Sequence, residues 1–100
     1  MSHTCTEAER RLFQAILTLR TEEECCQFFD DLCTIKELQD LSQRLEVAEM
    51  LSDGKNYQEV SRATGASTAT ISRVNKCLNY GNRGYQTVLS RMKENEDSKS

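Results

Sequence analysis

Residues 57–78, YQEVSRATGASTATISRVNKCL, have the pattern of two short helices joined by a tight turn. Asn56 precedes them as a favourable N-cap, and Glu59 three positions later completes a capping-box pattern. We therefore expect the first helix to run from about residue 56 to residue 63. Gly65 follows it, and a residue without Cβ enters the left-handed region at little cost. Ser67 predicts the start of the second helix, because its hydroxyl can accept from a free amide of the first turn.

The apolar positions of the pair indicate how the two helices face. The residues expected to point inward are Val60, Ala63, Ala66, Ile71, Val74 and Leu78. Those left on the outer face of the second helix are Ser67, Thr68, Ala69, Ser72, Arg73 and Lys76. This outer face has short side chains with basic residues towards one end. Such a face suits a helix that enters the major groove of DNA, where bulky residues would hold it away from the bases.

Two groups of residues are the predicted DNA contacts. We expect the base-facing set to be Ser67, Thr68, Ala69, Thr70 and Ser72, whose methyls and hydroxyls suit base edges. We expect the phosphate-contacting set to be Lys55, Arg62, Arg73 and Lys76, which position the protein without reading sequence. Simpler roles stay open for two of these residues. Arg62 could serve only to solvate the first helix, and Thr70 could bond to its own backbone.

The charge of the chain is sorted along the sequence. The total is −3, which by itself does not favour DNA as a partner. Residues 1–53 hold five basic and twelve acidic residues, whereas residues 54–93 hold seven basic and one acidic residue. The helix pair therefore lies in a segment of net charge +6, and that local field is what a phosphate backbone requires.

Composition indicates one small, all-α domain. The chain has 100 residues, no proline and four glycines. Long helices are therefore easy to form, and the turn residues that separate the strands of a sheet are scarce. We expect a single all-helical DNA-binding domain over residues 1–93 and a disordered tail over residues 94–100, which is polar and charged. No apolar run reaches the length of a membrane span, and the N-terminus lacks the pattern of a signal peptide. We therefore expect a cytoplasmic protein with no membrane partner.

The cysteines do not indicate a metal site or a disulfide framework. Their number is odd and no two have the C-x-x-C spacing: Cys5, Cys25, Cys26, Cys33 and Cys77. In a reducing cytoplasm they are expected to be free thiols, although a redox role for Cys25 and Cys26 stays open. The only histidine is His3, near the terminus. We expect no metal, no cofactor and no enzymatic activity, because the serines and threonines have no nearby base and no phosphate loop is present.

Four further helices are predicted around the pair. The first runs from Thr6 to about Arg20, and its apolar face is too wide for one neighbour, which indicates contact with several partners. Thr21 with Glu24 opens a second helix, and the pattern Thr34 with Glu37 opens the longest, from residue 35 to about residue 52. Its predicted inward stripe is Leu38, Leu41, Leu45, Ala48 and Leu51. After a turn at residues 79–84, a last helix covers residues 85 to about 93.

Two segments resemble the tryptophan repressor family, and the whole pattern is most similar to its YerC/YecD branch. They are TIKELQDLSQRLEVAEML, residues 34–51, and GASTATISRVNKCL, residues 65–78. The run G-A-x-x-A-T-I-[ST]-R is the specific part. The resemblance implies a six-helix fold with a helix-turn-helix, and an intertwined homodimer that presents its two helix-turn-helix units to successive major grooves. It also implies a regulator of transcription, with repression as the expected action.

The resemblance also implies a pocket for the corepressor tryptophan. The matching positions are Thr34, Arg44 and Arg73, but Val74 and Cys77 stand where tryptophan-binding members have glycine and serine. The isopropyl group of Val74 takes space that the indole ring would need, and overpacking of this kind costs about 1–3 kcal/mol. We therefore expect a protein that does not respond to tryptophan. Either Val74 fills the slot itself, or a different small-molecule effector occupies it.

A second function stays open at this point. The chain could be a protein-interaction adaptor of the transcription machinery that has kept the helix-turn-helix shape. The acidic first half would then hold the partner, and the outer face of the second helix would bind no DNA.

Overall fold

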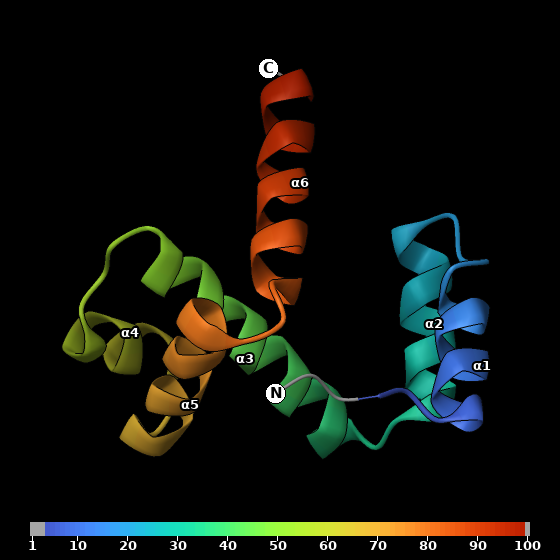
Figure 1. Cartoon of the computed structure of the whole chain (residues 1–100), viewed down its shortest axis with the longest axis horizontal. Helices are drawn as coiled ribbons and strands as arrows, with labels where there is room; N and C mark the ends of the chain where they lie inside the picture. Colours follow the sequence, from blue (N-terminus) through green and yellow to red (C-terminus); the bar gives the residue numbers. More distant parts are fainter. Residues whose placement is uncertain (1–3, 100) are drawn as a thin grey trace. The chain divides into compact units, whose positions relative to one another are not determined.

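The computed structural model describes residues 4–99, in which six α-helices and no strands occur. The helices are α1 (Glu7–Ile16), α2 (Glu22–Leu32), α3 (Ile35–Ser52), α4 (Tyr57–Thr64), α5 (Thr68–Tyr80) and α6 (Gly84–Lys99) (Figure 1). The predicted all-α class and the order of elements are confirmed, with the helix pair fourth and fifth. Within these residues, no helix combines the length and the apolar composition that a membrane crossing needs. His3 lies outside the described residues.

Helix starts follow the predicted caps. Thr34 and Glu37 form a complete capping box, in which Thr34 Oγ1 accepts from Glu37 N at 3.1 Å and Glu37 Oε1 accepts from Thr34 N at 2.8 Å. At the start of α2, Thr21 Oγ1 accepts from Glu24 N at 3.0 Å, but the carboxylate of Glu24 accepts from Arg20 N rather than from Thr21. The capping pattern therefore located both starts correctly.

Helix ends were predicted less well. The first helix ends at Ile16, four residues earlier than predicted, and the Thr18 hydroxyl donates to the carbonyl of Ala15 at 2.7 Å in the turn that follows. The last helix continues to Lys99, so the expected end at residue 93 is wrong. The expected disorder of the tail stays a prediction. A polar composition shows that a segment lies in water, but residues 85–99 contain neither proline nor glycine to stop a helix.

The contacts divide the chain into two units, residues 1–40 and residues 41–100. In the first unit, no described residue is buried, and Phe28 and Phe29 make an edge-to-face contact with ring centroids 5.6 Å apart. Large apolar side chains stay exposed there, among them Leu17 at 82% and Ile35 at 79%. The predicted single domain over residues 1–93 stays a prediction.

The second unit holds the core. Its buried residues come from α3, α4, α5 and the turn between α4 and α5: Val47, Ala48, Val60, Ala66, Ile71 and Val74. Tyr85 and Leu89 of α6 pack against this cluster, as do Met50 and Leu51 of α3. Figure 1 shows α4 and α5 beside the C-terminal part of α3, with α6 leading away from the end of α5.

Two of the predicted inward positions are corrected by this packing. Ala63 is exposed, because the face of α4 that meets the other helices is centred on Val60. Leu41 is 43% exposed, and Val47, which lay outside the predicted stripe, is fully buried beside Ala48. Leu78 is half-buried, as are Leu45 and Leu51 of the predicted stripe, so its inward position is not contradicted. The helical period predicts the inward-facing apolar stripe of a helix to within about one residue. The helices packed against it determine which of the adjacent residues is buried.

The turn between α5 and α6 allows no side chain at Gly81. A Cβ built there would lie 2.4 Å from the backbone oxygen of Cys77, which accepts the Gly81 amide at 2.9 Å. Gly84, at the start of α6, differs in this respect, because a Cβ added there would meet no heavy atom within 4 Å and its φ is not positive. The two glycines therefore provide a matched pair.

We predict that Gly81→Ala lowers the free energy of unfolding by about 1–3 kcal/mol, because backbone must move to admit the methyl group. Gly84→Ala should leave it unchanged or raise it by up to about 1 kcal/mol, since alanine restricts the unfolded chain more than glycine. Urea denaturation at one fixed protein concentration measures both values. Equal stabilities for the two variants would contradict the close approach at Gly81.

Candidate nucleic-acid interface

The turn between α4 and α5 is fixed by one glycine and three side-chain hydrogen bonds. Gly65 has a φ of 74°, in the left-handed region, and its amide donates to Ser61 O at 2.9 Å. The Ser61 hydroxyl donates to Ala66 O at 3.2 Å, and Thr64 Oγ1 accepts from Ala66 N at 3.1 Å while donating to Val60 O at 2.8 Å. The predicted left-handed turn at Gly65 is confirmed, and the direction in which α5 leaves α4 is set by these bonds.

The helix pair is also tied to α3. Gln43 Nε2 of α3 donates to the carbonyl of Thr64 at 3.2 Å, which satisfies an acceptor at the end of α4. Beneath this bond, Val60 and Ile71 are fully buried with Val47 of α3. One side of each helix is thus occupied, and the opposite side of α5 is left to the solvent.

Ser67 caps α5 as predicted. Its Oγ accepts from Thr70 N at 3.1 Å and donates to Thr70 Oγ1 at 3.1 Å. Thr70 is half-buried, whereas Ser67 is exposed. Each hydroxyl of this pair therefore already has one partner within the helix. The partner of the Thr70 hydroxyl is the Ser67 side chain and not the backbone bond that was the simpler role open from sequence. The predicted contact of Thr70 with a base stays a prediction.

The remaining predicted base-facing residues form an open surface. Thr68, Ala69 and Ser72 are all exposed on the first turn and a half of α5. None of these side chains is larger than threonine, so the backbone of α5 can approach another surface closely. Short methyl and hydroxyl groups of this kind fit the edges of bases in the major groove.

Basic side chains surround this surface. Arg73 and Lys76 are exposed on the following turns of α5, and Arg62 and Lys55 are exposed on α4 and on the segment before it. Glu59 is the single acidic residue between positions 54 and 93. The four predicted phosphate contacts therefore lie in the second unit with the short residues of α5, although no phosphate contact is tested by this geometry.

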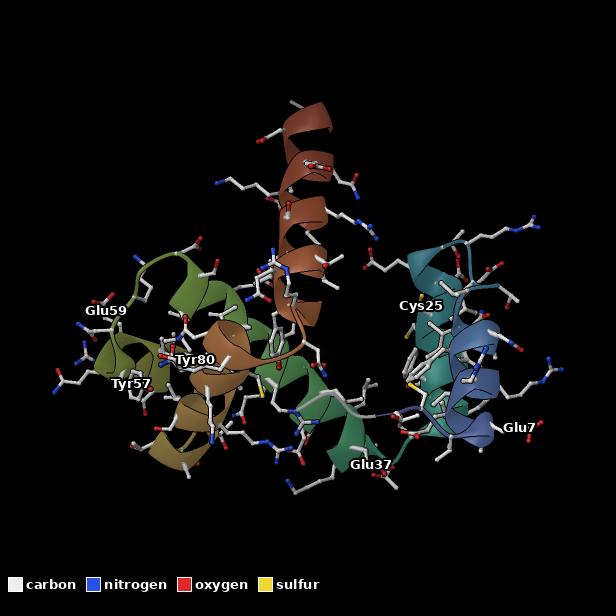
Figure 2. All side chains as sticks on the ribbon, viewed as in Figure 1. Glu7, Cys25, Glu37, Tyr57, Glu59 and Tyr80 are labelled. Carbon is white, nitrogen blue, oxygen red and sulfur yellow. The ribbon has the colours of Figure 1, made fainter. Side chains whose placement is uncertain are left out.

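A shallow cleft of about 480 Å³ lies between α4 and the start of α5. Its lining residues are Tyr57, Gln58, Ser61, Arg62 and Thr68. Figure 2 labels Tyr57 on α4, near the N-terminus of that helix. Tyr57 and Gln58 were not among the predicted DNA contacts, because neither residue is charged. Gln58 lies four residues before Arg62 and Tyr57 four residues before Ser61, and this helical spacing is the signal in the sequence that could have identified them.

The residues predicted for an effector pocket are not all in one unit. Thr34 belongs to residues 1–40, where its hydroxyl caps α3. Arg44 is half-buried on α3, while Arg73 and Cys77 are exposed on α5. Val74 is only 1% exposed and belongs to the core cluster with Val47 and Ile71. The isopropyl group of Val74 is therefore already a packed part of the protein interior.

Comparison with known proteins gives consistent results along most of the chain. The family model of the Trp repressor protein matches residues 7–93. The uncharacterized protein YerC of Bacillus subtilis strain 168 is 59% identical over 90 residues, which cover 90% of this chain and 86% of YerC. Because YerC is itself uncharacterized, this similarity does not indicate a specific function for the chain.

Two solved structures resemble this one closely. A candidate Trp repressor from Staphylococcus aureus superposes with a TM-score of 0.85 at 54% identity, covering 89% of each chain. A TrpR-like protein from Eubacterium eligens gives a TM-score of 0.85 at 55% identity, covering 88% of this chain and 91% of that one. The fold predicted from the residues of the helix pair and of α3 is thus confirmed.

Proposed function

Because the chain belongs to the Trp repressor protein family, a family of DNA-binding regulators, we propose that it is a transcriptional repressor that binds specific double-stranded DNA as a homodimer. The observation that carries the proposal is the outer face of α5, where exposed Thr68, Ala69 and Ser72 are flanked by exposed basic residues. In this reading the short residues meet base edges, and Lys55, Arg62, Arg73 and Lys76 meet phosphates.

The helix-turn-helix geometry supports this division of roles. In proteins of this kind the N-terminal part of the second helix contacts the bases, and the first helix crosses the backbone. Here the smallest exposed side chains are at the N-terminal part of α5, and Arg62 lies on α4. The Gly65 turn and the Gln43 bond hold the two helices in a fixed relation. The bases can therefore be read without rearrangement of the pair.

The exposed apolar side chains support a homodimer. In the described part of the first unit no residue is buried, and four large apolar side chains are exposed: Phe13, Leu17, Leu32 and Ile35. A segment without buried residues lacks the hydrophobic contribution that offsets the entropy of ordering its helices. A second copy of the chain, intertwined through these helices, would supply the missing contacts. Two reading helices would then face half-sites about 34–36 Å apart.

The packing of Val74 supports a regulator that does not use tryptophan. A side chain that is 99% covered by its own core leaves no vacant slot at that position for an indole ring. Of the two alternatives open from sequence, self-filling by Val74 is the one this packing favours. Arg73, exposed at the preceding position of α5, is then available for phosphate.

We predict that the wild-type protein selects a two-fold repeated sequence from a random DNA pool and binds it with a log–log salt slope of roughly −5 to −7, from about six to eight phosphate contacts. The double variant Thr68→Glu, Ser72→Glu should abolish this binding, because it places four carboxylates per dimer against DNA. Electrophoretic mobility shift at several salt concentrations measures both effects.

The control for this experiment carries the same added charge elsewhere. Gln27→Glu with Gln39→Glu changes two exposed residues of α2 and α3 and should keep DNA binding within a few-fold. A flat salt dependence, or equal binding by both double variants, would contradict the proposal. Loss of DNA binding together with capture of a transcription protein through the acidic first half would favour the adaptor reading.

We predict a solution mass of about twice the 11.4 kDa chain mass in sedimentation equilibrium. Leu17→Asp with Ile35→Asp should dissociate or unfold the protein, since these side chains would become buried charges in a dimer. In a monomer both positions are exposed, so the same changes would be tolerated. Gln27→Asp, at an exposed polar position, is the control that should leave the mass unchanged. A wild-type monomer would refute the homodimer.

We predict that calorimetry detects no tryptophan binding at micromolar affinity. Val74→Gly with Cys77→Ser removes the isopropyl group and adds a hydroxyl, so this variant should bind tryptophan more tightly than the wild type does. Circular dichroism confirms that the variant is folded, because loss of a buried valine costs about 2 kcal/mol or more. Micromolar binding by the wild type would overturn the assignment of Val74 as a filler.

A further inference from the structure

Tyr80 at the C-terminal end of α5 is an unusually exposed aromatic residue. It is 83% exposed, although a tyrosine side chain normally covers much of its ring against the protein. Figure 2 labels it at the end of α5 that is remote from Gly65. Neither the predicted contacts with bases nor those with phosphates include it. Its exposure is therefore unexplained by the function as proposed so far.

Tyr80 lies in line with the reading surface of α5. With about 100° of rotation per residue, Tyr80 is on the side of the helix opposite to the buried Ile71 and Val74. Ala69 and Lys76 share that side, since they lie eleven and four residues before Tyr80. One continuous exposed stripe thus runs from the short residues, past Lys76, to an aromatic ring.

The part of this stripe beyond Ser72 is about as long as the major groove is wide. Tyr80 is eight residues beyond Ser72, or about 12 Å at 1.5 Å per residue. The major groove is about 12 Å wide, so a helix with Ser72 over the bases brings its position 80 to the edge of the groove. The sugar–phosphate backbone lies there. A phenol can donate a hydrogen bond to a phosphate oxygen, and its ring can cover the adjacent deoxyribose.

The end of α5 is held firmly enough to position such a contact. Gly81 N donates to Cys77 O, and no Cβ fits at Gly81. Gln86 Nε2 of α6 donates to the carbonyl of Leu78, which fastens α6 to the last turn of α5. Asn79, beside Tyr80, donates to Asn75 O and Oδ1, so its amide nitrogen is already engaged within the helix. The backbone that carries Tyr80 is thus defined on both sides.

The surroundings of Tyr80 have the charge that a phosphate requires. Lys76 lies one turn before it, and Arg83 lies in the following turn with a backbone φ of 68° and an exposed side chain. No acidic residue occurs between positions 60 and 93. A DNA backbone is complementary in charge to this cationic end of α5.

From these observations we infer that Tyr80, with Arg83, clamps the sugar–phosphate backbone at the edge of the major groove beyond the bases read by α5. This inference rests on the proposed function and extends it. The clamp sets how far α5 can slide along its own axis in the groove, but it carries no sequence information itself. Tyr80 is therefore a positioning residue, and Thr68, Ala69 and Ser72 remain the residues that distinguish sequences.

The test compares DNA affinities of Tyr80→Phe, Tyr80→Ala and Arg83→Gln with that of the wild-type dimer on the selected site. Tyr80→Phe removes one hydrogen bond to a charged phosphate oxygen in each subunit and should weaken binding roughly tenfold or more per subunit. Tyr80→Ala should weaken it further, because the ring is lost as well. Neither should change the salt slope, whereas Arg83→Gln should reduce its magnitude by about 2 per dimer. Tyr85→Phe, which removes a hydroxyl from a tyrosine packed on the core, is the matched control and should bind as the wild type does.

A second readout separates a backbone clamp from a base contact. For Tyr80→Phe the affinity for the selected site and for a scrambled site should fall by the same factor, whereas Ser72→Ala should reduce only the former. Wild-type affinity of Tyr80→Phe and Tyr80→Ala, while the wild type keeps its steep salt dependence, would overturn the clamp and leave the proposed function standing. Dissociation of the dimer by Tyr80→Ala would also overturn it, by placing Tyr80 between copies. Absence of any DNA binding by the wild type would overturn both.

Discussion

The contact of α5 with α3, made through Ile71, Val74 and Val47, is the constraint on which the rest of the second unit depends. These three side chains are covered almost completely, so α5 has one orientation about its own axis. The residues on its opposite side are exposed as a consequence. Gly65 acts with this contact, because its left-handed conformation brings the start of α5 back across α4. Together they determine which side chains of α5 another molecule can meet.

The outer face of α5 that results is graded in size and charge. It begins with threonine, alanine and serine, continues with arginine and lysine, and ends in the exposed ring of Tyr80. A helix that carries its small residues at one end and its long ones at the other can lie obliquely in a groove. Short side chains let the helix approach the base edges closely, and long side chains can extend to the DNA backbone at the edge of the groove.

Position 74 links regulation to packing. The same place on α5 that the family resemblance assigns to an effector pocket holds a side chain belonging to the core. A small molecule would have to displace packed atoms there, and interiors at crystal-like density resist this. Under the proposed function, the valine would provide permanently the filling that a corepressor would otherwise provide. Under the proposed function, the reading helices would be in place without a ligand, and control would act through the amount of protein or through another effector site.

Much of this protein was determined by the order of its residues alone. The six helices, the caps at Thr34, Asn56 and Ser67, and the turn at Gly65 depend on residues within about four positions of one another, so their signals are local. Other features were decided only by tertiary structure. The burial of Val47, the exposure of Ala63 and the exposure of Leu41 depend on where helices from distant parts of the chain meet. A helical period of 3.6 residues leaves two or three neighbouring positions equally able to face inward, and only the contact with another helix distinguishes them.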